Sequence, residues 1–137
     1  FNDTFGHQMG DDVLAALGDC IASVTQRSSD CSARYGGEEF AVILPGVGAD
    51  ETLCVAEAIR SKIGALRELQ QGRPDRLPTV SIGAATLVPQ AGPTPRDLIK
   101  AADAALYAAQ EAGRDRVMVA PIPRDLPREK PVEKLAA

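Results

Sequence analysis

Two adjacent carboxylates stand directly before a segment that is expected to form a strand. Glu38 and Glu39 follow Gly36 and Gly37 and precede the apolar run FAVIL. Like charges repel each other and carboxylates are poor strand formers, so a role other than folding is indicated. A tight turn, with the positive φ that glycine tolerates, would hold both acids where a hard cation such as Mg²⁺ binds. A solvated acidic turn is the alternative that these residues leave open.

The rest of the chain must supply the elements that position this turn. Hydrophobic periodicity and turn residues predict three helices, over 10–26, 49–69 and 94–113, a hairpin over 33–45, and strands over 79–88 and 114–120. This order predicts an α+β fold, with an antiparallel-rich sheet backed by helices. One strand ahead of residue 1 would complete the sheet.

Composition narrows the class of protein. The chain has 137 residues, 45% of them hydrophobic, and this suits one soluble domain with its own core. A net charge of −4 argues against a nucleic-acid partner, and no stretch is apolar for long enough to predict membrane contact. The three cysteines have no metal-like spacing, so reduced thiols in a cytoplasmic protein are expected.

The end of the chain differs from the rest. Residues 121–137 contain four prolines and many charges without periodicity, which predicts a tail or linker and places the domain at 1–120.

Four separated motifs identify a family resemblance. NDTFGHQMGD, RYGGEEF, VSIGAA and ADAALYAAQEAGRDRV occur in this order, and together they resemble the GGDEF family, the diguanylate cyclases, in its GGEEF variant. The resemblance runs from residue 1 to about 120. It implies a nucleotidyl-cyclase or polymerase-palm type of α+β domain, whose first strand would precede Phe1, so that the chain as given is truncated at its N-terminus.

The resemblance also implies an activity. Two GTP molecules would condense to cyclic di-GMP and two pyrophosphates, with Mg²⁺ or Mn²⁺ as cofactor. A homodimer would bring two nucleotide sites face to face, and an upstream regulatory or sensory domain would control the reaction.

The carboxylate turn acquires roles from this resemblance. Glu38 matches the family's metal-binding acid, which is also proposed to help deprotonate the 3′-hydroxyl, and Glu39 matches the adjacent auxiliary acid. Gly36 and Gly37 would let the backbone approach the nucleotide closely.

Other matching positions would bind the nucleotide. Asn2 and Asp11 match the two residues that read guanine, and a carboxylate can accept from the N1–H and amino group of guanine together. The alternative for Asp11 is an acid at a helix start. Arg114 matches a phosphate-contacting arginine, with a solvated surface charge as the alternative. His7 is expected to be structural.

A second site is predicted at Arg27 and Asp30. Their R-x-x-D spacing, just upstream of the signature turn, matches the family's inhibitory site for cyclic di-GMP. Arginine can pair with phosphate and stack on guanine, while aspartate takes the guanine edge. The alternative is a pair of helix-end charges with a capping aspartate. Some relatives add an arginine from the next helix, where this chain has Ala58, with Arg60 nearby.

Two departures from the family pattern weaken the enzyme interpretation. The family's first metal-binding aspartate would lie upstream of Phe1, and Gln110 stands where a lysine is usual. A hydrogen bond to a charged group is worth about 1.5–3 kcal/mol against roughly 1 for a neutral one, so weaker GTP binding is predicted. A catalytically weak domain that senses cyclic di-GMP is therefore the main alternative, and a purely structural dimerisation domain is the third.

Overall fold

The computed structural model describes residues 7–73, 76–88, 92–121 and 132–136, with side chains described from residue 10 to residue 121 within those ranges. The helices and strands, in chain order, are α2 (His7–Val24), β1 (Cys31–Arg34), β2 (Phe40–Ile43), α3 (Ala49–Leu69), β3 (Ile82–Leu87), α4 (Pro95–Glu111), β4 (Val117–Val119) and β5 (Val132–Ala136). None of the helices in this part of the chain is long and apolar enough to cross a membrane.

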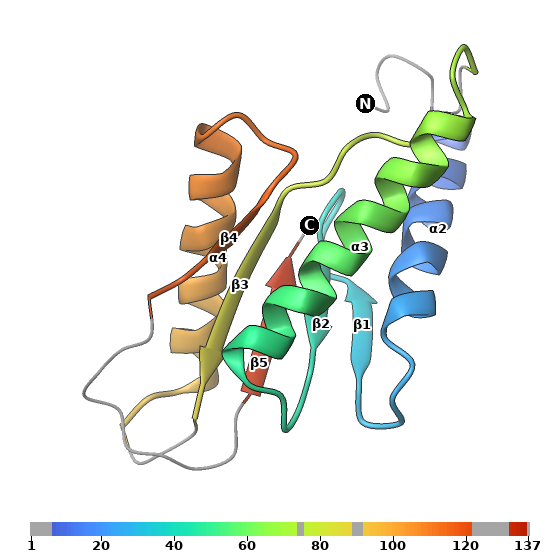
Figure 1. Cartoon of the computed structure of the whole chain (residues 1–137). Helices are drawn as coiled ribbons and strands as arrows, with labels where there is room; N and C mark the ends of the chain where they lie inside the picture. The colour runs from blue at the N-terminus through green and yellow to red at the C-terminus, as the bar shows by residue number, and fades with distance from the viewer. Residues whose placement is uncertain (1–6, 74–75, 89–91, 122–131, 137) are drawn as a thin grey trace.

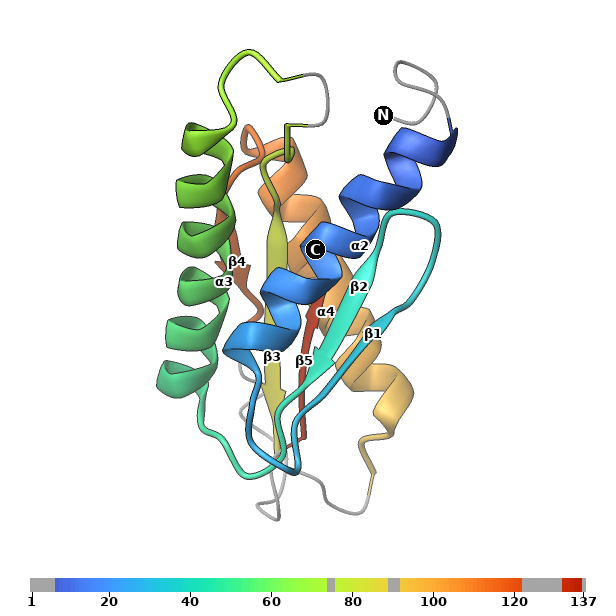
Figure 2. The same cartoon turned by 90° about the vertical axis from the view of Figure 1, so that its right-hand side faces the viewer.

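The five strands form one sheet in the order β1-β2-β5-β3-β4. Neighbouring strands are antiparallel except for the parallel pair of β3 and β4. This arrangement confirms the predicted α+β fold with an antiparallel-rich sheet. Helices cover both faces: α2 and α3 lie on one side of the sheet and α4 on the other (Figures 1 and 2).

Strand β3 is buried on both faces because it lies between these helical layers. Ile82 and Ala84 belong to the core on the side of α2 and α3, whereas Ala85 and Leu87 pack toward α4. A strand covered on both sides is apolar throughout rather than alternating, and the run IGAATL fits that pattern.

Helix α4 begins at a capping box. Thr94 accepts a hydrogen bond from the backbone N–H of Asp97 at 3.3 Å, and the Asp97 carboxylate accepts from the N–H of Thr94 at 2.7 Å. This reciprocal capping box, followed by Pro95 at the first helical position, satisfies N–H groups that would otherwise lack partners.

Helix α2 begins earlier than predicted. It starts at His7 rather than near residue 10 and ends at Val24, so its first turn contains no acidic residue. Asp11 consequently lies in the second turn, where a helix-start charge has little effect.

The end of the chain also differs from the prediction of a tail or linker over 121–137. Residues 132–136 form β5, which pairs antiparallel with both β2 and β3 in the middle of the sheet. The open sides of β2 and β3 need hydrogen-bond partners, and five residues are enough to supply them, although five are too few to show periodicity. Residues 122–131 lie outside the described residues.

The three cysteines are free thiols in the structure. Cys31 and Cys54 are exposed, and Cys20 is buried on α2. Burial raises the pKa of the Cys20 thiol, an effect that nearby Lys62 opposes and Asp19 reinforces. Cys20 therefore behaves as a small apolar core residue.

We expect Gly83→Ala to destabilise the fold strongly, by about 3 kcal/mol, because overpacking against backbone cannot be relieved by a rotamer change. A Cβ at Gly83 would overlap the backbone N of Leu106 and the backbone O of Ala102 in α4. Gly64→Ala is the matched control, since the added Cβ would meet nothing within 4 Å apart from its chain neighbours and the backbone of its own helix, α3. It should stabilise by about 0.5–1 kcal/mol. Urea midpoints of both variants measure this, and equal midpoints would contradict the predicted contact.

Candidate active site

The carboxylate turn spans residues 35–39 and joins β1 to β2, whose register pairs Arg34 with Phe40. The backbone N–H groups of Tyr35 and Gly36 both donate to the carbonyl of Glu39, at 2.7 and 3.2 Å. The two acids thus stand on a closed loop at the end of a hairpin, as the sequence predicted.

The expected conformation of the two glycines is wrong. Neither Gly36 nor Gly37 is among the residues with positive φ. A five-residue loop can reverse the chain without left-handed residues, unlike the tight glycine turn that was expected. An added Cβ at Gly37 would meet no described atom within 4 Å, and at Gly36 it would meet only Glu39, at 3.8 Å or more. The glycines therefore leave open space beside the turn.

Arg34 holds this loop in place, a role that the sequence analysis missed. Its Nε donates to the carbonyls of Gly37 and Gly36 at 3.1 and 3.3 Å, and a terminal nitrogen donates to the Gly37 carbonyl at 2.7 Å. The only available signal was an arginine next to a glycine-rich turn. Because a guanidinium offers several donors in a fixed plane, it can satisfy two loop carbonyls at once.

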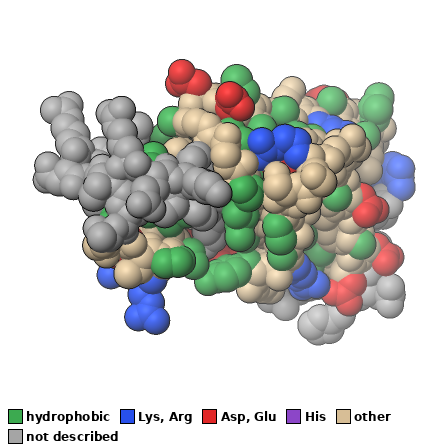
Figure 3. Space-filling view, turned by 90° about the horizontal axis from the view of Figure 1, so that it is seen from below, with side chains coloured by type: hydrophobic (Ala, Val, Ile, Leu, Met, Phe, Trp, Pro, Cys, Tyr) green, Lys and Arg blue, Asp and Glu red, His purple; other side chains and the backbone are tan. Residues whose placement is uncertain are grey.

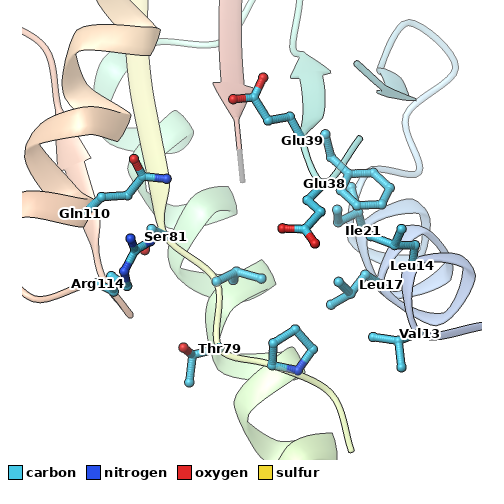
Figure 4. A pocket seen from close by; sticks show the side chains of 13 residues that line it. Val13, Leu14, Leu17, Ile21, Glu38, Glu39, Thr79, Ser81, Gln110 and Arg114 are labelled. Atoms are coloured by element: carbon cyan, nitrogen blue, oxygen red, sulfur yellow. The ribbon is translucent and has the colours of Figure 1, made fainter. Parts of the chain in front are cut away.

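A cavity of about 370 Å³ opens beside the turn. The acids Glu38 and Glu39 line it, with Gln110 and Arg114 at the end of α4 on the other side (Figure 4). In Figure 4 the Glu38 carboxylate points into the space, while the Glu39 carboxylate is directed away from Glu38. The structure therefore brings three sequence-predicted site residues, Glu38, Glu39 and Arg114, to one cavity, together with Gln110.

The remaining walls are of two kinds. One wall is apolar and comes from α2, through Val13, Leu14, Leu17 and Ile21. The other is the segment 78–81 leading into β3, where Thr79 and the nearly buried Ser81 bring hydroxyl groups. Neither hydroxyl residue was predicted from the sequence as part of a site, because both lie in a range predicted to be strand, whereas β3 begins only at Ile82.

Arg114 follows the C-terminus of α4. Its backbone N–H donates to the carbonyl of Ala109 at 2.9 Å, and its own carbonyl accepts from Nε of Arg116 at 3.0 Å. The residue is exposed and has a positive φ of 64°. Its place on the cavity argues against the alternative of an unrelated surface charge.

Of the two predicted guanine readers, only Asp11 is among the residues that the structure describes. Asp11 is exposed on α2 and does not line the cavity. Asn2 lies outside the described residues, and so does the side chain of His7. The alternative of a helix-start acid loses support for Asp11, because the residue is not in the first turn of α2.

Arg27 and Asp30 lie at the opposite end of β1 from the carboxylate turn (Figure 1). Arg27 donates to the Asp30 carboxylate from Nε at 2.8 Å and from a terminal nitrogen at 2.6 Å, and also to the Pro45 carbonyl at 3.0 Å. The Asp30 side chain is only 4% exposed and that of Arg27 47%. Figure 3 views this end, where acidic, basic and hydrophobic side chains are mixed.

The bond between Arg27 and Asp30 fits the predicted capping alternative as well as a binding site, since Asp30 also accepts from the Arg27 backbone N–H at 3.2 Å. Arg60 does not complete this site. It bonds to Glu57 and to Asp115 at 3.3 Å, on the side of α3 that faces the α4–β4 turn.

The two glutamates of the turn could contribute to a metal site. No group of three or more His, Cys, Asp or Glu residues gathers in the described part of the chain. Mg²⁺ is nevertheless commonly held by one or two carboxylates together with substrate phosphates and water. The donor set therefore fits a cation that arrives with a phosphorylated ligand, rather than one held in a complete protein cage.

Comparison with known proteins gives a consistent family. The family model described as "Diguanylate cyclase, GGDEF domain" matches residues 1–116. The response regulator PleD of Caulobacter vibrioides is 41% identical over 118 residues, which are 85% of this chain and 26% of PleD. The chain thus spans about a quarter of the length of this relative.

Solved structures agree with the sequence match. The GGDEF domain of DgcB from Caulobacter crescentus, in complex with c-di-GMP, superposes with a TM-score of 0.72 at 36% identity, covering 86% of this chain and 68% of that one. The active GGEEF domain of a Vibrio cholerae diguanylate cyclase gives 0.75 at 29% identity, covering 88% and 74%. With a matching family model over most of its length, this chain belongs to the family of diguanylate cyclase GGDEF domains.

Proposed function

We propose that the cavity beside the carboxylate turn binds GTP and that the protein condenses two GTP molecules into cyclic di-GMP. The observation that carries this proposal is the meeting of Glu38, Glu39 and Arg114 at one cavity, from two elements far apart in sequence. Its volume of about 370 Å³ lies in the usual range for small-molecule pockets.

Each wall then has a task. Arg114 binds the phosphates through charged hydrogen bonds, and the aliphatic side chains of α2 offer an apolar surface for a base. Asn2 and Asp11 read the guanine edge, as the family resemblance implies. Because each chain supplies one such site and the product contains two nucleotides, two copies must face each other.

The reaction forms a bond from the 3′-oxygen of one nucleotide to the α-phosphorus of the other, and pyrophosphate leaves. Glu38 helps to accept the 3′-hydroxyl proton and, with Glu39 as auxiliary, holds Mg²⁺ or Mn²⁺. The bound cation would neutralise phosphate charge and polarise the hydroxyl. Holding both reactants in line supplies much of the rate.

A second candidate is a receptor for cyclic di-GMP that has little or no turnover. The neutral Gln110 on the cavity wall favours it, because this position offers no charge to the triphosphate. In that case Arg27 and Asp30 would be the functional site, and a ligand there would have to replace the hydrogen bonds that they make with each other.

The deciding experiment incubates the full-length protein with GTP and Mg²⁺ and separates the nucleotides by chromatography. A c-di-GMP phosphodiesterase in a parallel sample prevents product from accumulating. Cyclic di-GMP, or its linear hydrolysis product in the parallel sample, is expected. Unchanged GTP in both samples would favour the receptor instead.

Glu38→Gln should lower the rate of cyclic di-GMP formation by a factor of about 10² or more, the usual contribution of a positioned acid or base. Stability should change by less than about 0.5 kcal/mol, because Glu38 is exposed. Glu51→Gln, an exposed glutamate in the first turn of α3, is the matched control and should keep the parent rate. A Glu38→Gln enzyme as fast as the parent would show that the residue is not in the active site.

Gln110→Lys should tighten GTP binding about fivefold, because a charged donor replaces a neutral one on the cavity wall. Titration calorimetry with a non-hydrolysable GTP analogue and Mg²⁺ measures the change. Gln71→Lys adds the same charge at an exposed position outside the cavity and serves as control. Equal affinities for the two lysine variants would mean that residue 110 does not contact the triphosphate.

Arg27→Lys should raise the concentration of cyclic di-GMP needed for half-inhibition, while the initial rate stays the same. Lysine keeps the charge but loses the planar pair of donors that now reaches Asp30. Inhibition curves at fixed GTP measure this, with Arg96→Lys, at an exposed position of α4, as control. An unchanged inhibition curve would show that Arg27 does not bind cyclic di-GMP and that its pair with Asp30 is only a structural cap.

A further inference from the structure

The turn between α4 and β4 contains three consecutive residues in the left-handed region. Their φ values are 119° for Gly113, 64° for Arg114 and 46° for Asp115. Glycine adopts such values freely and aspartate tolerates them, but arginine rarely does. A backbone of this kind persists only where its surroundings hold it in place.

Local hydrogen bonds account for part of this hold. The N–H groups of Gly113 and Arg114 donate to the carbonyls of Gln110 and Ala109, at 3.3 and 2.9 Å. Beyond the turn, the N–H of Ile82 in β3 donates to the carbonyl of Arg116 at 2.9 Å. These bonds fix the two ends of the turn, to the end of α4 and to the start of β3.

The middle of the turn is held by a residue from another layer. A terminal nitrogen of Arg60 on α3 donates to the Asp115 carboxylate at 3.3 Å, across 55 positions of sequence. Nε of Arg60 also donates to Glu57 at 3.1 Å, and this second partner, one turn earlier on α3, keeps the guanidinium in place. The hydrogen bond with Glu57 and the contact with Asp115 raise the pKa of Arg60, so it stays charged.

Adjacent residues of the turn line different cavities. Arg114 lines the cavity that holds Glu38, whereas Asp115 lines a second cavity of about 230 Å³ together with Arg60. Thr79 and Val80 line both cavities and so lie between them. In Figure 4 the Arg114 side chain lies beside Ser81 at the edge of the first cavity. A rotation of the turn that moved Asp115 off Arg60 would move Arg114 as well.

We propose that the ion pair between Arg60 and Asp115 is a positioning device, which holds the α4–β4 turn left-handed and so aims Arg114 at the phosphates. This inference rests on the proposed function, which assigns the phosphates of GTP to Arg114. Neither Arg60 nor Asp115 lines the first cavity, so both act through Arg114 and through the backbone.

Asp115→Gly tests this device, because it removes the carboxylate while glycine keeps the left-handed conformation accessible. In the full-length protein the affinity for a non-hydrolysable GTP analogue with Mg²⁺ should fall about two- to fivefold, the range expected for a half-exposed ion pair. The affinity for guanosine should not change. Asp115→Asn keeps an acceptor and should lose less.

Two controls separate positioning from general damage. Glu57→Gln removes the charge of the other partner of Arg60 but keeps an acceptor oxygen for its Nε and leaves the turn untouched, so the analogue affinity should stay at the parent value. In an Arg114→Gln background Asp115→Gly should have no further effect on analogue affinity, since there is no guanidinium left to position.

The proposal is overturned if Asp115→Gly binds the analogue like the parent, if it loses guanosine affinity equally, or if its effect persists without Arg114. A parent protein that binds no analogue at all would overturn the proposed function instead. Hydrogen exchange at the amides of Gly113 and Arg114 then decides the positioning claim by itself. Faster exchange in Asp115→Gly supports it, and unchanged exchange overturns it.

Discussion

The close contact between α4 and β3 at Gly83 is the constraint on which the rest of the structure depends. The backbone of α4 at Ala102 and Leu106 lies where a side chain on Gly83 would be, and the small residues Ala102 and Ala109 are fully buried nearby. This contact fixes the position of α4 along the sheet. The helix therefore ends beside the start of β3, and Gln110 and Arg114 reach the cavity from there.

The hairpin of β1 and β2 positions the carboxylate turn on the opposite wall of the cavity. Strand β1 lies at the edge of the sheet, with the Arg27–Asp30 pair at one end and the carboxylate turn at the other. Four extended residues span on the order of 13 Å, so the two charged sites are separate yet rigidly connected. Arg34 adds a side-chain clamp at the carboxylate end. Both sites are loops held by regular elements, as is usual for binding residues.

The sequence predicted those features that short patterns encode. Helix α3 has its predicted range, α4 begins at a capping box, and Glu38 and Glu39 lie on the turn of the hairpin as expected. The pairing of β5 depends on open strand edges that no local pattern reveals, and α2 begins ahead of Val13, where its apolar helical pattern starts. The contact of Arg60 with Asp115 spans 55 positions, so a single sequence gives no sign of it.

The charges around the cavity explain why the proposed chemistry needs a cation. Among the described residues, the charged side chains that line it are two carboxylates and one guanidinium, and Gln110 adds no positive charge. A triphosphate brought to this wall alone would meet net repulsion from Glu38 and Glu39. A divalent ion would reverse that balance by adding positive charge, and Glu38 and Glu39 would hold it together with the phosphates. Under the proposed function the paired acids are therefore tolerated at an exposed turn, where water screens their repulsion until cation and nucleotide arrive together.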